Sequence, residues 1–358
     1  MKQTMKMYAK NSTIFKLLNP LRLEFIKYAE SQLSDLAYFT KRHKKIFGYE
    51  PDFKHPATFN EKIIHRILFD RNPLYTHLAD KLKARIYIAN TLQNIANERE
   101  REREREREIL ASCDSLGDNA SLDTTLHLLN KPIDSIKDEL FKTNSCEFLP
   151  KLYGIYDDVK SIDFNALPQS FVLKTNHDCG GVVLVKNKDD FLNDKVTFNN
   201  AMQKLTKHLS TNYYNLYREY HYKDIEPKIF SEEMLEGKFE NGDFQYPENY
   251  RFFMFKHEIF VQIDDARYFE NHKRYFYDKN WEFQAFSYNM PIRNDCIKKP
   301  KNFAFMKKLA IALAFDFVRV DLYEANGKVF VGELTFTPCG GLAKWNPAEI
   351  DKVFGKLW

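Results

Sequence analysis

Asp321-Leu-Tyr-Glu-Ala-Asn-Gly-Lys-Val-Phe-Val-Gly-Glu333-Leu-Thr335 is a stretch in which apolar and polar residues alternate on both sides of an Asn-Gly dipeptide. Period-two alternation is typical of strands, and Asn-Gly favours a tight turn, so the stretch predicts a β-hairpin. One strand carries Asp321, and the other carries Glu333 and Thr335. Mg²⁺ prefers carboxylate and phosphate oxygens as ligands. The hairpin therefore predicts a metal site if these side chains share one face.

The register of the hairpin decides which face each acid occupies. A two-residue turn would pair Ala325 with Lys328 and place the two acids on opposite faces. A three-residue loop that ends at a left-handed Gly327 pairs Glu324 with Lys328 and returns the acids to one face, as diagonal neighbours about 7–8 Å apart. We predict the three-residue loop. The alternative is a solvent-facing surface in which the acids form ion pairs with Arg319.

A second candidate site lies upstream, where Phe171–Lys174 and Val182–Val185 predict strands on either side of a loop. Gly180 and Gly181 in this loop would let backbone N–H groups approach an anion closely, and Lys174 offers a positive charge for phosphate. The alternative is an ordinary hairpin turn. Cys179 is also in the loop, but it lacks a paired base other than His177, so we interpret it as a thiol without a catalytic role.

Two further groups are candidates for nucleotide contacts. The predicted strand 228–235 ends with two acids, and such an end can present backbone groups to adenine and a carboxylate to ribose; the alternative is a charged strand end. Arginine side chains suit bidentate binding of phosphate or carboxylate. The acidic strand end comprises Glu232, Glu233 and Leu235, and the basic group comprises Arg251, Arg267, His272, Lys273, Arg274 and Arg319.

The composition limits the class of protein. The 358 residues include 31 Phe and 20 Tyr, which is enough for two or three packed lobes and excludes a disordered chain. The net charge of +4 argues against a nucleic-acid-binding protein. We expect neither a signal peptide nor a transmembrane segment. Five widely spaced cysteines form no disulfide or metal pattern, which favours the cytoplasm.

The sequence predicts four segments. Residues 1–92 form an N-terminal helical region, in which Thr58 to Glu61 is a helix-capping box. Residues 93–146 form a polar, low-complexity insert with an alternating Glu/Arg run, which we interpret as a solvated spacer. Residues 147–235 and 236–358 form two β-rich lobes, the first with the glycine loop and the second with the acidic hairpin.

The order of these signals along the chain, rather than any one of them, is specific. The order matches that of the ATP-grasp superfamily: a strand lysine, a glycine loop, an acidic strand end, a basic strand and an acidic hairpin. The chain resembles the TupA-like ATP-grasp family, named for a teichuronopeptide biosynthesis protein, over residues 48–92 and 147–350. The resemblance is carried by Pro56-Ala-Thr-Phe-Asn-Glu-Lys62, Asp70-Arg-Asn-Pro-Leu-Tyr75, Asp80-Lys81 with Arg85, Phe171-Val-Leu-Lys-Thr-Asn-His177, Phe317-Val-Arg-Val-Asp-Leu-Tyr323 and Gly332-Glu-Leu-Thr-Phe-Thr-Pro338.

The resemblance implies an α+β ATP-grasp fold in which two lobes enclose ATP and Mg²⁺. It implies that Arg85, Lys174 and Arg251 contact the nucleotide and that the loop from His177 to Gly181 closes over its phosphates. The resemblance also assigns the remaining roles: Glu232 to Leu235 line adenine and ribose, Asp321, Glu333 and Thr335 bind Mg²⁺, and Arg267 or Arg319, with Lys174, steadies the transferred phosphoryl group.

This sequence departs from the family pattern at three places. Asp178 and Cys179 precede the two loop glycines where Gly-Ser is expected, and an aspartate there would repel phosphate. Thr335 replaces an expected Asn, and Cys339 begins a Cys-Gly-Gly in place of Gly-Ser-Gly. These departures bear on activity rather than on the fold.

The implied reaction is carboxylate activation. A small-molecule or glycan carboxylate would attack the γ-phosphate of ATP to form an acyl phosphate, which an amine donor converts to an amide. Family context suggests bacterial surface polysaccharide biosynthesis, with peripheral association with glycan-assembly proteins. Two alternatives stay open: a glycosyltransferase or polysaccharide-assembly protein that binds a nucleotide sugar, and a non-catalytic ATP-grasp homologue.

Overall fold

The computed structural model describes residues 28–107, 122–238, 244–245, 247–265, 273–292 and 297–358. The chain divides into two compact units, Met1–Asp52 and Phe53–Trp358. In the first unit, helix α3 (Asp35–Phe47) begins where the Ser34 side chain accepts a hydrogen bond from Ala37 N at 3.2 Å. It ends at Gly48, whose φ of 85° is accessible to glycine at little cost.

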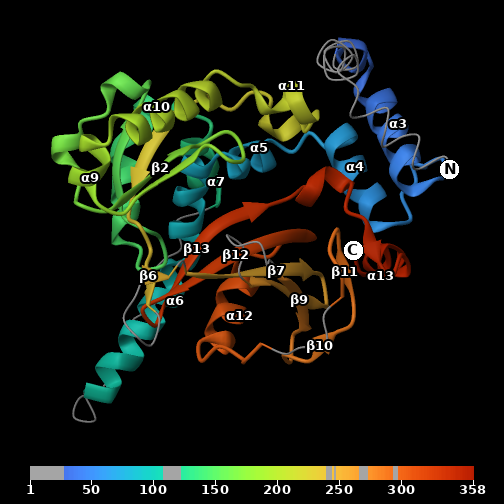
Figure 1. The fold of residues 1–358 in the computed structure, drawn as a ribbon. Helices are drawn as coiled ribbons and strands as arrows, with labels where there is room; N and C mark the ends of the chain where they lie inside the picture. The colour runs from blue at the N-terminus through green and yellow to red at the C-terminus, as the bar shows by residue number, and fades with distance from the viewer. Residues whose placement is uncertain (1–27, 108–121, 239–243, 246, 266–272, 293–296) are drawn as a thin grey trace. The chain divides into compact units, whose positions relative to one another are not determined.

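The second unit contains two sheet-bearing lobes (Figure 1). The first lobe is a four-stranded antiparallel sheet in the order β1-β4-β2-β3. Helices α9 and α10 pack against it, because Phe191, Ala201 and Leu205 are buried with Phe171 and Leu173 of the sheet. The bounds are β1 (Leu152–Tyr156), β2 (Phe171–Thr175), β3 (Val182–Val185), β4 (Ile229–Glu232), α9 (Lys188–Asn193), α10 (Lys195–Leu209) and α11 (Tyr213–Tyr217).

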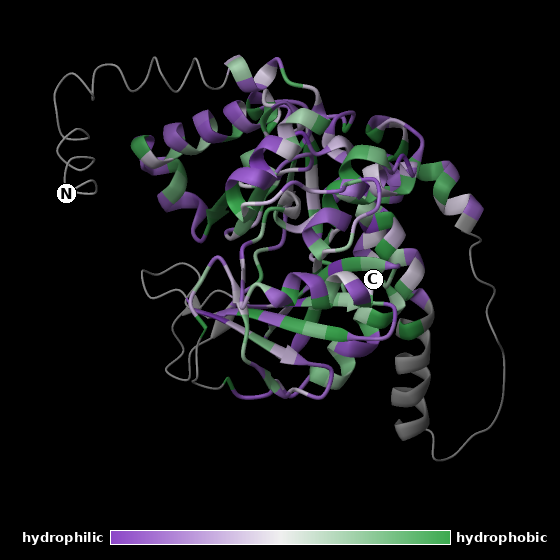
Figure 2. Ribbon diagram, turned by 90° about the vertical axis from the view of Figure 1, so that its right-hand side faces the viewer, coloured by the Kyte–Doolittle hydropathy of each residue, from purple (hydrophilic) through white to green (hydrophobic). Residues whose placement is uncertain are grey.

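The second lobe is a six-stranded antiparallel sheet in the order β10-β9-β8-β7-β12-β13. Figure 2 shows hydrophobic residues concentrated along its strands. Two short pairs, β11 with β14 and β5 with β6, complete the described strands. The bounds are β5 (Gly237–Lys238), β6 (Phe244–Gln245), β7 (Glu248–Phe255), β8 (Ile259–Asp265), β9 (Lys273–Asp278), β10 (Phe283–Gln284), β11 (Ser287–Tyr288), β12 (Phe317–Ala325), β13 (Lys328–Thr335) and β14 (Trp345–Asn346).

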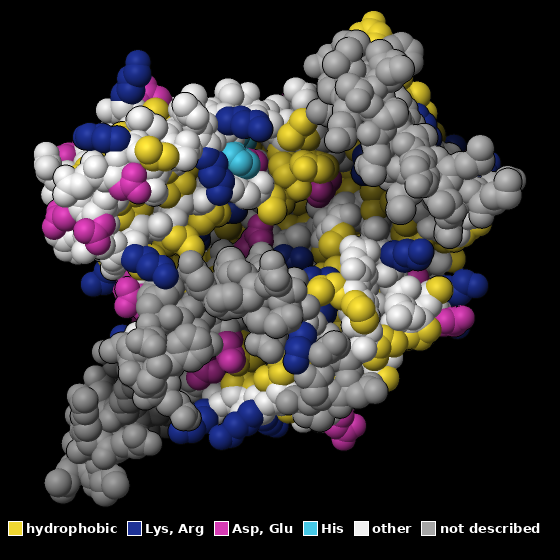
Figure 3. Space-filling view, in the orientation of Figure 1, with side chains coloured by type: hydrophobic (Ala, Val, Ile, Leu, Met, Phe, Trp, Pro, Cys, Tyr) yellow, Lys and Arg dark blue, Asp and Glu magenta, His cyan; other side chains and the backbone are white. Residues whose placement is uncertain are grey.

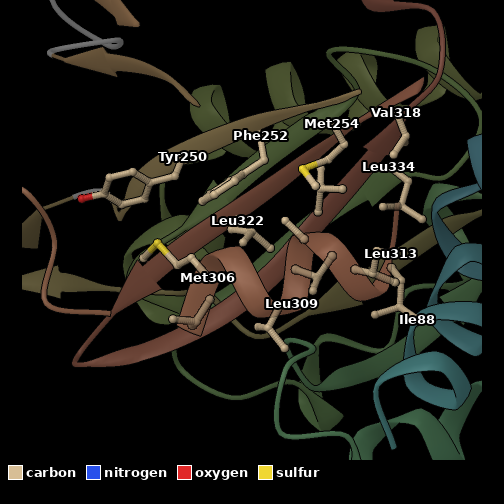
Figure 4. Packing of buried hydrophobic residues seen from close by; sticks show 14 of the residues in the cluster. Ile88, Tyr250, Phe252, Met254, Met306, Leu309, Leu313, Val318, Leu322 and Leu334 are labelled. Atoms are coloured by element: carbon tan, nitrogen blue, oxygen red, sulfur yellow. The ribbon is translucent and has the colours of Figure 1, made fainter. Parts of the chain in front are cut away.

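The largest core lies between this sheet and helix α12 (Phe303–Ala312). Figure 4 shows Met306, Leu309 and Leu313 in the same packed cluster as Phe252 and Leu322 of the sheet. Leu309 and Leu313 are fully buried. Burial of such side chains, at roughly 1.5–3 kcal/mol each, fixes the sheet that carries the acidic hairpin.

Further helices connect the lobes. The predicted capping box is confirmed, because Thr58 and Glu61 exchange the expected hydrogen bonds at the start of α4. Helix α13 packs on α4 through Asp351, which accepts a hydrogen bond from Asn60 N at 2.9 Å. The bounds are α4 (Phe59–Phe69), α5 (Pro73–Ala79), α6 (Lys81–Arg107), α7 (Leu122–Leu129), α8 (Lys137–Lys142), α13 (Glu349–Leu357), η1 (Ile133–Ile136), η2 (Thr143–Ser145), η3 (Val159–Ser161), η4 (Phe164–Ala166), η5 (Tyr220–Tyr222) and η6 (Pro338–Gly341).

The second half of the predicted insert is not a solvated spacer. Its apolar residues Leu129, Ile133, Ile136 and Leu140 are buried in a cluster that includes Phe230 of the first lobe. Their spacing of three or four residues places them on one side of short helical turns, a pattern that the polar composition of the whole segment obscures. Residues 108–121 lie outside the described residues, and the division into four segments stays a prediction.

Candidate active site

The turn of the acidic hairpin differs from the predicted one, but the two acids share a face as predicted. Ala325 pairs with Lys328, so the turn has two residues, and Asn326 and Gly327 both have positive φ, 51° and 75°. The predicted three-residue loop is therefore wrong. The acids still share a face because the register shifts at Gly332, which is bulged out of the β12–β13 pairing.

The bulge makes the two acids direct neighbours. Leu322 pairs with Val331, whereas Asp321 pairs with Glu333, so one extra residue resets the side-chain alternation. The predicted diagonal relation is replaced by direct opposition. Gly332 suits this position because a Cβ there would lie 2.3 Å from Tyr323 Cε2.

Arginines surround the acidic pair. Arg319 Nε and Nη2 donate to Asp321 Oδ1 and Oδ2 at 2.6 and 2.9 Å, and Arg319 Nη2 also donates to Thr335 Oγ1 at 3.0 Å. Arg251 Nε lies 3.3 Å from Asp321 Oδ2, and Arg319 lies 3.7 Å from Glu333. Burial raises the pKa of the Asp321 carboxyl above its ordinary value, opposed by the two arginines and aided by Glu333. The four predicted residues of this hairpin are thus brought together.

The predicted basic group continues along the same sheet. Asp264 on β8 lies between Arg251 on β7 and Arg274 on β9, and it forms ion pairs with both. Burial would raise the pKa of Asp264, but the two arginines outweigh it and hold that pKa well below its ordinary value. Arg274 also lies over the Tyr288 ring, 4.2 Å from its centroid. Arg267 and His272 lie outside the described residues.

The strand lysine forms a second charged cluster in the first lobe. Lys174 forms an ion pair with Glu232 of the neighbouring strand β4, and Arg85 Nη1 lies 3.4 Å from the same carboxylate. Burial alone would lower the pKa of Lys174, but the charges of Glu232 and Tyr323 outweigh it and raise that pKa. The influence of Tyr323 places the lysine near the acidic hairpin.

The rest of the acidic strand end diverges from this cluster. Strand β4 ends at Glu232, not at Leu235 as predicted, and Leu235 is half-buried in the segment that follows. The Glu233 side chain accepts a hydrogen bond from Lys151 N at 3.1 Å, and its own N–H donates to Lys151 O. The Glu233 side chain therefore lies at the edge of β1 and not in the Lys174 cluster, and its predicted nucleotide contact stays a prediction.

The glycine loop is held by its own aspartate. The Asp178 carboxylate accepts a hydrogen bond from Thr175 Oγ1 and pairs with His208 Nδ1 on helix α10. Asp178 is buried, and its carbonyl accepts from Lys81 Nζ. The Asp178 carboxylate is therefore engaged by two side chains of its own lobe, and its expected repulsion of phosphate stays a prediction.

The loop requires glycine at positions 180 and 181 for two different reasons. Gly180 has a φ of 101°, which disfavours any other residue. A Cβ on Gly181 would lie 1.9 Å from Thr175 Oγ1, so the backbone approaches closely there. His177 is buried with its ring 3.2 Å from Thr211 O. It supports the base of the loop and is not joined to the acidic pair.

The loop faces the acidic hairpin. The protein packed around the Cys179 thiol, and then the charge of Glu333, raise the pKa of that thiol, while Arg319 opposes the rise. Figure 3 shows acidic and basic side chains gathered where the two sheet-bearing lobes face each other. The lysine, the glycine loop and the acidic pair, far apart in sequence, therefore line one region.

Sequence analysis missed Glu219, which joins this region. Glu219 follows α11 and is only 6% exposed, and its Oε2 accepts a hydrogen bond from Thr337 Oγ1 at 2.5 Å. Burial raises its pKa to about 7, and Glu333 contributes to the rise. No motif marks the position, but the run Tyr213 to Tyr222, with five tyrosines around the acid, was an available signal.

The residues fit Mg²⁺ and a triphosphate. Asp321 and Glu333 supply two carboxylates on one face, and the described residues hold no group of three His, Cys, Asp or Glu side chains that would form a metal site on their own. Mg²⁺ commonly takes one or two carboxylates and completes its octahedron with phosphate oxygens and water. The buried Arg251 Nε lies 3.3 Å from Asp321 Oδ2 without forming a hydrogen bond of good geometry among the described residues, so its N–H could also serve an anion.

The comparisons identify the family. A profile of the TupA-like ATP-grasp family matches residues 143–358, which is more than half of the sequence. The chain belongs to the TupA-like ATP-grasp family. Membership places the α+β fold described above among the ATP-grasp folds. A search of the curated proteins finds no match.

Solved structures of ATP-grasp ligases are among the matches. D-alanine–D-alanine ligase from Bacillus anthracis is 14% identical, with a TM-score of 0.31, over 59% of this chain and 57% of that protein. The ATP-grasp ligase PsnB in complex with a minimal precursor is 10% identical, with a TM-score of 0.29, over 54% and 48%. Phosphoribosylglycinamide synthetase from Anaerococcus prevotii is 13% identical, with a TM-score of 0.27, over 57% and 42%. This chain spans about half the length of these proteins.

Proposed function

We propose that this member of the TupA-like ATP-grasp family is an ATP- and Mg²⁺-dependent carboxylate–amine ligase. The observation that carries the proposal is the direct opposition of Asp321 and Glu333 on one face of β12–β13, opposite the lysine and glycine loop of the other lobe. A paired carboxylate site facing phosphate-binding groups is what phosphoryl transfer requires, because catalysis there is mainly positioning and charge neutralisation.

The nucleotide would lie between the lobes. Lys174 and Arg85 offer positive charge in the first lobe, and both now share the carboxylate of Glu232. The backbone N–H groups beside Gly180 and Gly181 would hold phosphate oxygens. Segment 233–235 would contact adenine through its backbone, since the Glu233 side chain is engaged at Lys151.

Bound Mg²⁺ would neutralise charge on the phosphate oxygens, held by Asp321 and Glu333 with Thr335 beside them. Arg319 now satisfies both oxygens of Asp321, so a cation there would displace part of this ion pair and free the guanidinium. The freed Arg319, together with Arg251, would then stabilise negative charge on the transferred phosphoryl group. In the proposed mechanism a carboxylate oxygen would attack the γ-phosphorus and release ADP, and the amine would then attack the acyl carbon and release phosphate to form the amide.

The substrate class comes from family context. We propose a carboxylate on a bacterial surface glycan or its precursor, such as a uronic acid, and an amino acid as the amine donor. The arginines at the hairpin suit an anionic acceptor, and the absence of a nucleic-acid partner stays a prediction. No helix in the described part of the chain has the length and apolar character needed to cross a membrane. The cytoplasmic location stays a prediction.

The test is ADP release by the purified full-length chain with candidate uronic acids and amino acids. Release is expected to require Mg²⁺ and to be lost in Glu333→Ala. Glu282→Ala is the matched control, because Glu282 is exposed at the β9–β10 turn, away from the hairpin acids. Absence of turnover with every carboxylate would contradict the ligase proposal. Thermal stabilisation by UDP- or GDP-sugars but not by ATP would favour the nucleotide-sugar alternative.

A further inference from the structure

Glu219 is a buried carboxylate without a cation. Its side chain is 6% exposed, and Thr337 is the only described residue that donates a hydrogen bond to it, through Oε2. Oε1 faces Gly340, where an added Cβ would lie 3.5 Å away. No Lys, Arg or His among the described residues forms an ion pair with it. A buried charge usually has a partner, since an unpaired one costs several kcal/mol.

The backbone on both sides of this acid adopts unusual conformations. Arg218, immediately before it, has a φ of 60°. The facing turn contains three consecutive residues with positive φ, Cys339 to Gly341. Positive φ in a non-glycine residue costs free energy and tends to occur at functional sites. Here both segments bring backbone close to the same carboxylate.

Tyrosine rings surround the same place. Tyr213 and Tyr222 lie 4.8 Å apart between ring centroids, and Tyr217 lies 4.6 Å from Tyr213. None of the three hydroxyls has a hydrogen-bond partner among the described residues. Tyr222 N donates a hydrogen bond to Glu219 O at 3.1 Å, and burial, followed by the charges of Glu333 and Glu219, raises the pKa of Tyr222 far above its ordinary value. Figure 3 shows apolar side chains gathered at α11 with acidic ones next to them.

Aromatic faces and carboxylates together attract one kind of ligand. The π face of a tyrosine ring is electronegative and favours a cation within about 6 Å, and a carboxylate adds full charge. The other side of the site carries positive charge, because Lys174 and Arg319 lie there, and these side chains suit phosphate. The site thus divides into a cationic part for the nucleotide and an anionic, aromatic part.

We propose that Glu219, with the rings of Tyr213 and Tyr222, binds the ammonium group of the amine donor. This inference rests on the proposed ligase function and deepens it, because it assigns the second substrate a place and a charge. An ammonium ion there would supply the missing partner of Glu219 and would lie against the face that carries Glu333. The same charges disfavour an anionic donor.

The probe is L-alanine amide, which carries an ammonium group and no carboxylate, with N-acetyl-L-alanine amide as its uncharged counterpart. Binding to the full chain is measured by calorimetry in the presence of Mg²⁺ and a non-hydrolysable ATP analogue. We expect the ammonium probe to bind and the acetylated probe not to bind. We expect Glu219→Gln to weaken binding at least tenfold, and Glu282→Gln, at an exposed acid, to leave it unchanged.

A second pair of variants guards against misfolding at Glu219. Tyr222→Leu removes the ring face and should weaken binding about threefold to tenfold, whereas Tyr222→Phe keeps the face and should bind nearly as the parent chain does. Equal affinity of the parent and Glu219→Gln for the ammonium probe overturns the inference. So does a tenfold loss of Mg²⁺ affinity in Glu219→Gln with unchanged probe binding, since that would make Glu219 a metal ligand.

ADP release by the parent chain separates this inference from the ligase proposal. Turnover with a carboxylate together with Glu219-independent amine binding rejects the amine site and leaves the ligase proposal in place. Absence of turnover with every carboxylate rejects the ligase proposal. In that case Glu219-dependent probe binding would still establish an ammonium site, whereas the role of amine donor would be overturned.

Discussion

Replacing Glu219 by glutamine should stabilise the fold, and increasingly so as the pH rises. Burial raises the pKa of Glu219 from 4.5 to about 7, so the folded chain holds this proton more tightly than the unfolded chain does. Ionisation therefore costs folding free energy. The cost is absent below pH 4.5, grows as the pH rises to 7 and is complete above it. Glutamine cannot ionise, and its amide oxygen can still accept the hydrogen bond from Thr337.

The magnitude follows from the two pKa values. Each tenfold change in proton affinity is worth about 1.36 kcal/mol, so a pKa of about 7 in place of 4.5 corresponds to about 3 kcal/mol. That is large beside a typical stability of about 5–15 kcal/mol. At pH 5 the expected difference in unfolding free energy between the variant and the parent is less than about 1 kcal/mol, and at pH 8 it approaches about 3 kcal/mol.

Urea unfolding of both proteins at several values between pH 5 and pH 8, with EDTA and without nucleotide, measures this difference. Other titrating groups are common to both proteins and cancel, and Glu282→Gln shows how much an exposed acid contributes. A difference that stays constant across the range would mean that Glu219 ionises at its ordinary pKa. The argument for a buried carboxylate without a cation would then be lost.

Three smaller predictions concern the elements that frame the site. Gly332→Ala should cost about 1–3 kcal/mol and weaken ATP binding, because its Cβ would meet Tyr323; chemical denaturation and nucleotide titration would show it. Lys174→Met should destabilise the chain less in the presence of Glu232→Gln than alone, because the two side chains form an ion pair. A double-mutant cycle should give a coupling free energy of about 0.5–3 kcal/mol, and strict additivity would mean that the pair is not energetically linked. Leu309→Ala should cost about 2–5 kcal/mol in unfolding free energy, because its side chain is fully buried under the six-stranded sheet.

Regular periodicity made the elements of the second unit predictable. Strand β3 has the predicted bounds, and β2 extends one residue beyond its predicted end. The hairpin shows the limit of this reasoning. An Asn-Gly turn and the shared face of Asp321 and Glu333 were incompatible under strict alternation, so the prediction changed the turn. The chain keeps the turn and changes the strand, because glycine at position 332 allows a bulge.

The side-chain contacts that sequence analysis did not foresee have a common cause. Asp178, Glu233 and Glu219 are all acids whose roles depend on a partner distant in sequence: His208, Lys151 and Thr337, respectively. Neither spacing nor composition reveals such partners. Lys174 and the acidic pair were predictable because each is defined by its own strand, whereas their convergence needed the fold.

The separation of positive and negative charge across the site bears on the order in which nucleotide and amine would bind. In the structure Arg319 and Arg251 neutralise Asp321, whereas Glu219 and the tyrosines beside it lack a cation among the described residues. An amine that entered first would meet a carboxylate substrate not yet activated. A nucleotide with Mg²⁺ would instead draw Asp321 away from Arg319 and leave the arginine to the phosphoryl group, before the amine is needed. Under the proposed ligase function we therefore expect nucleotide first and amine last, and amine affinity should rise when the ATP analogue and Mg²⁺ are present, because together they bring net negative charge. Equal amine affinity with and without them would show that the two halves of the site act independently.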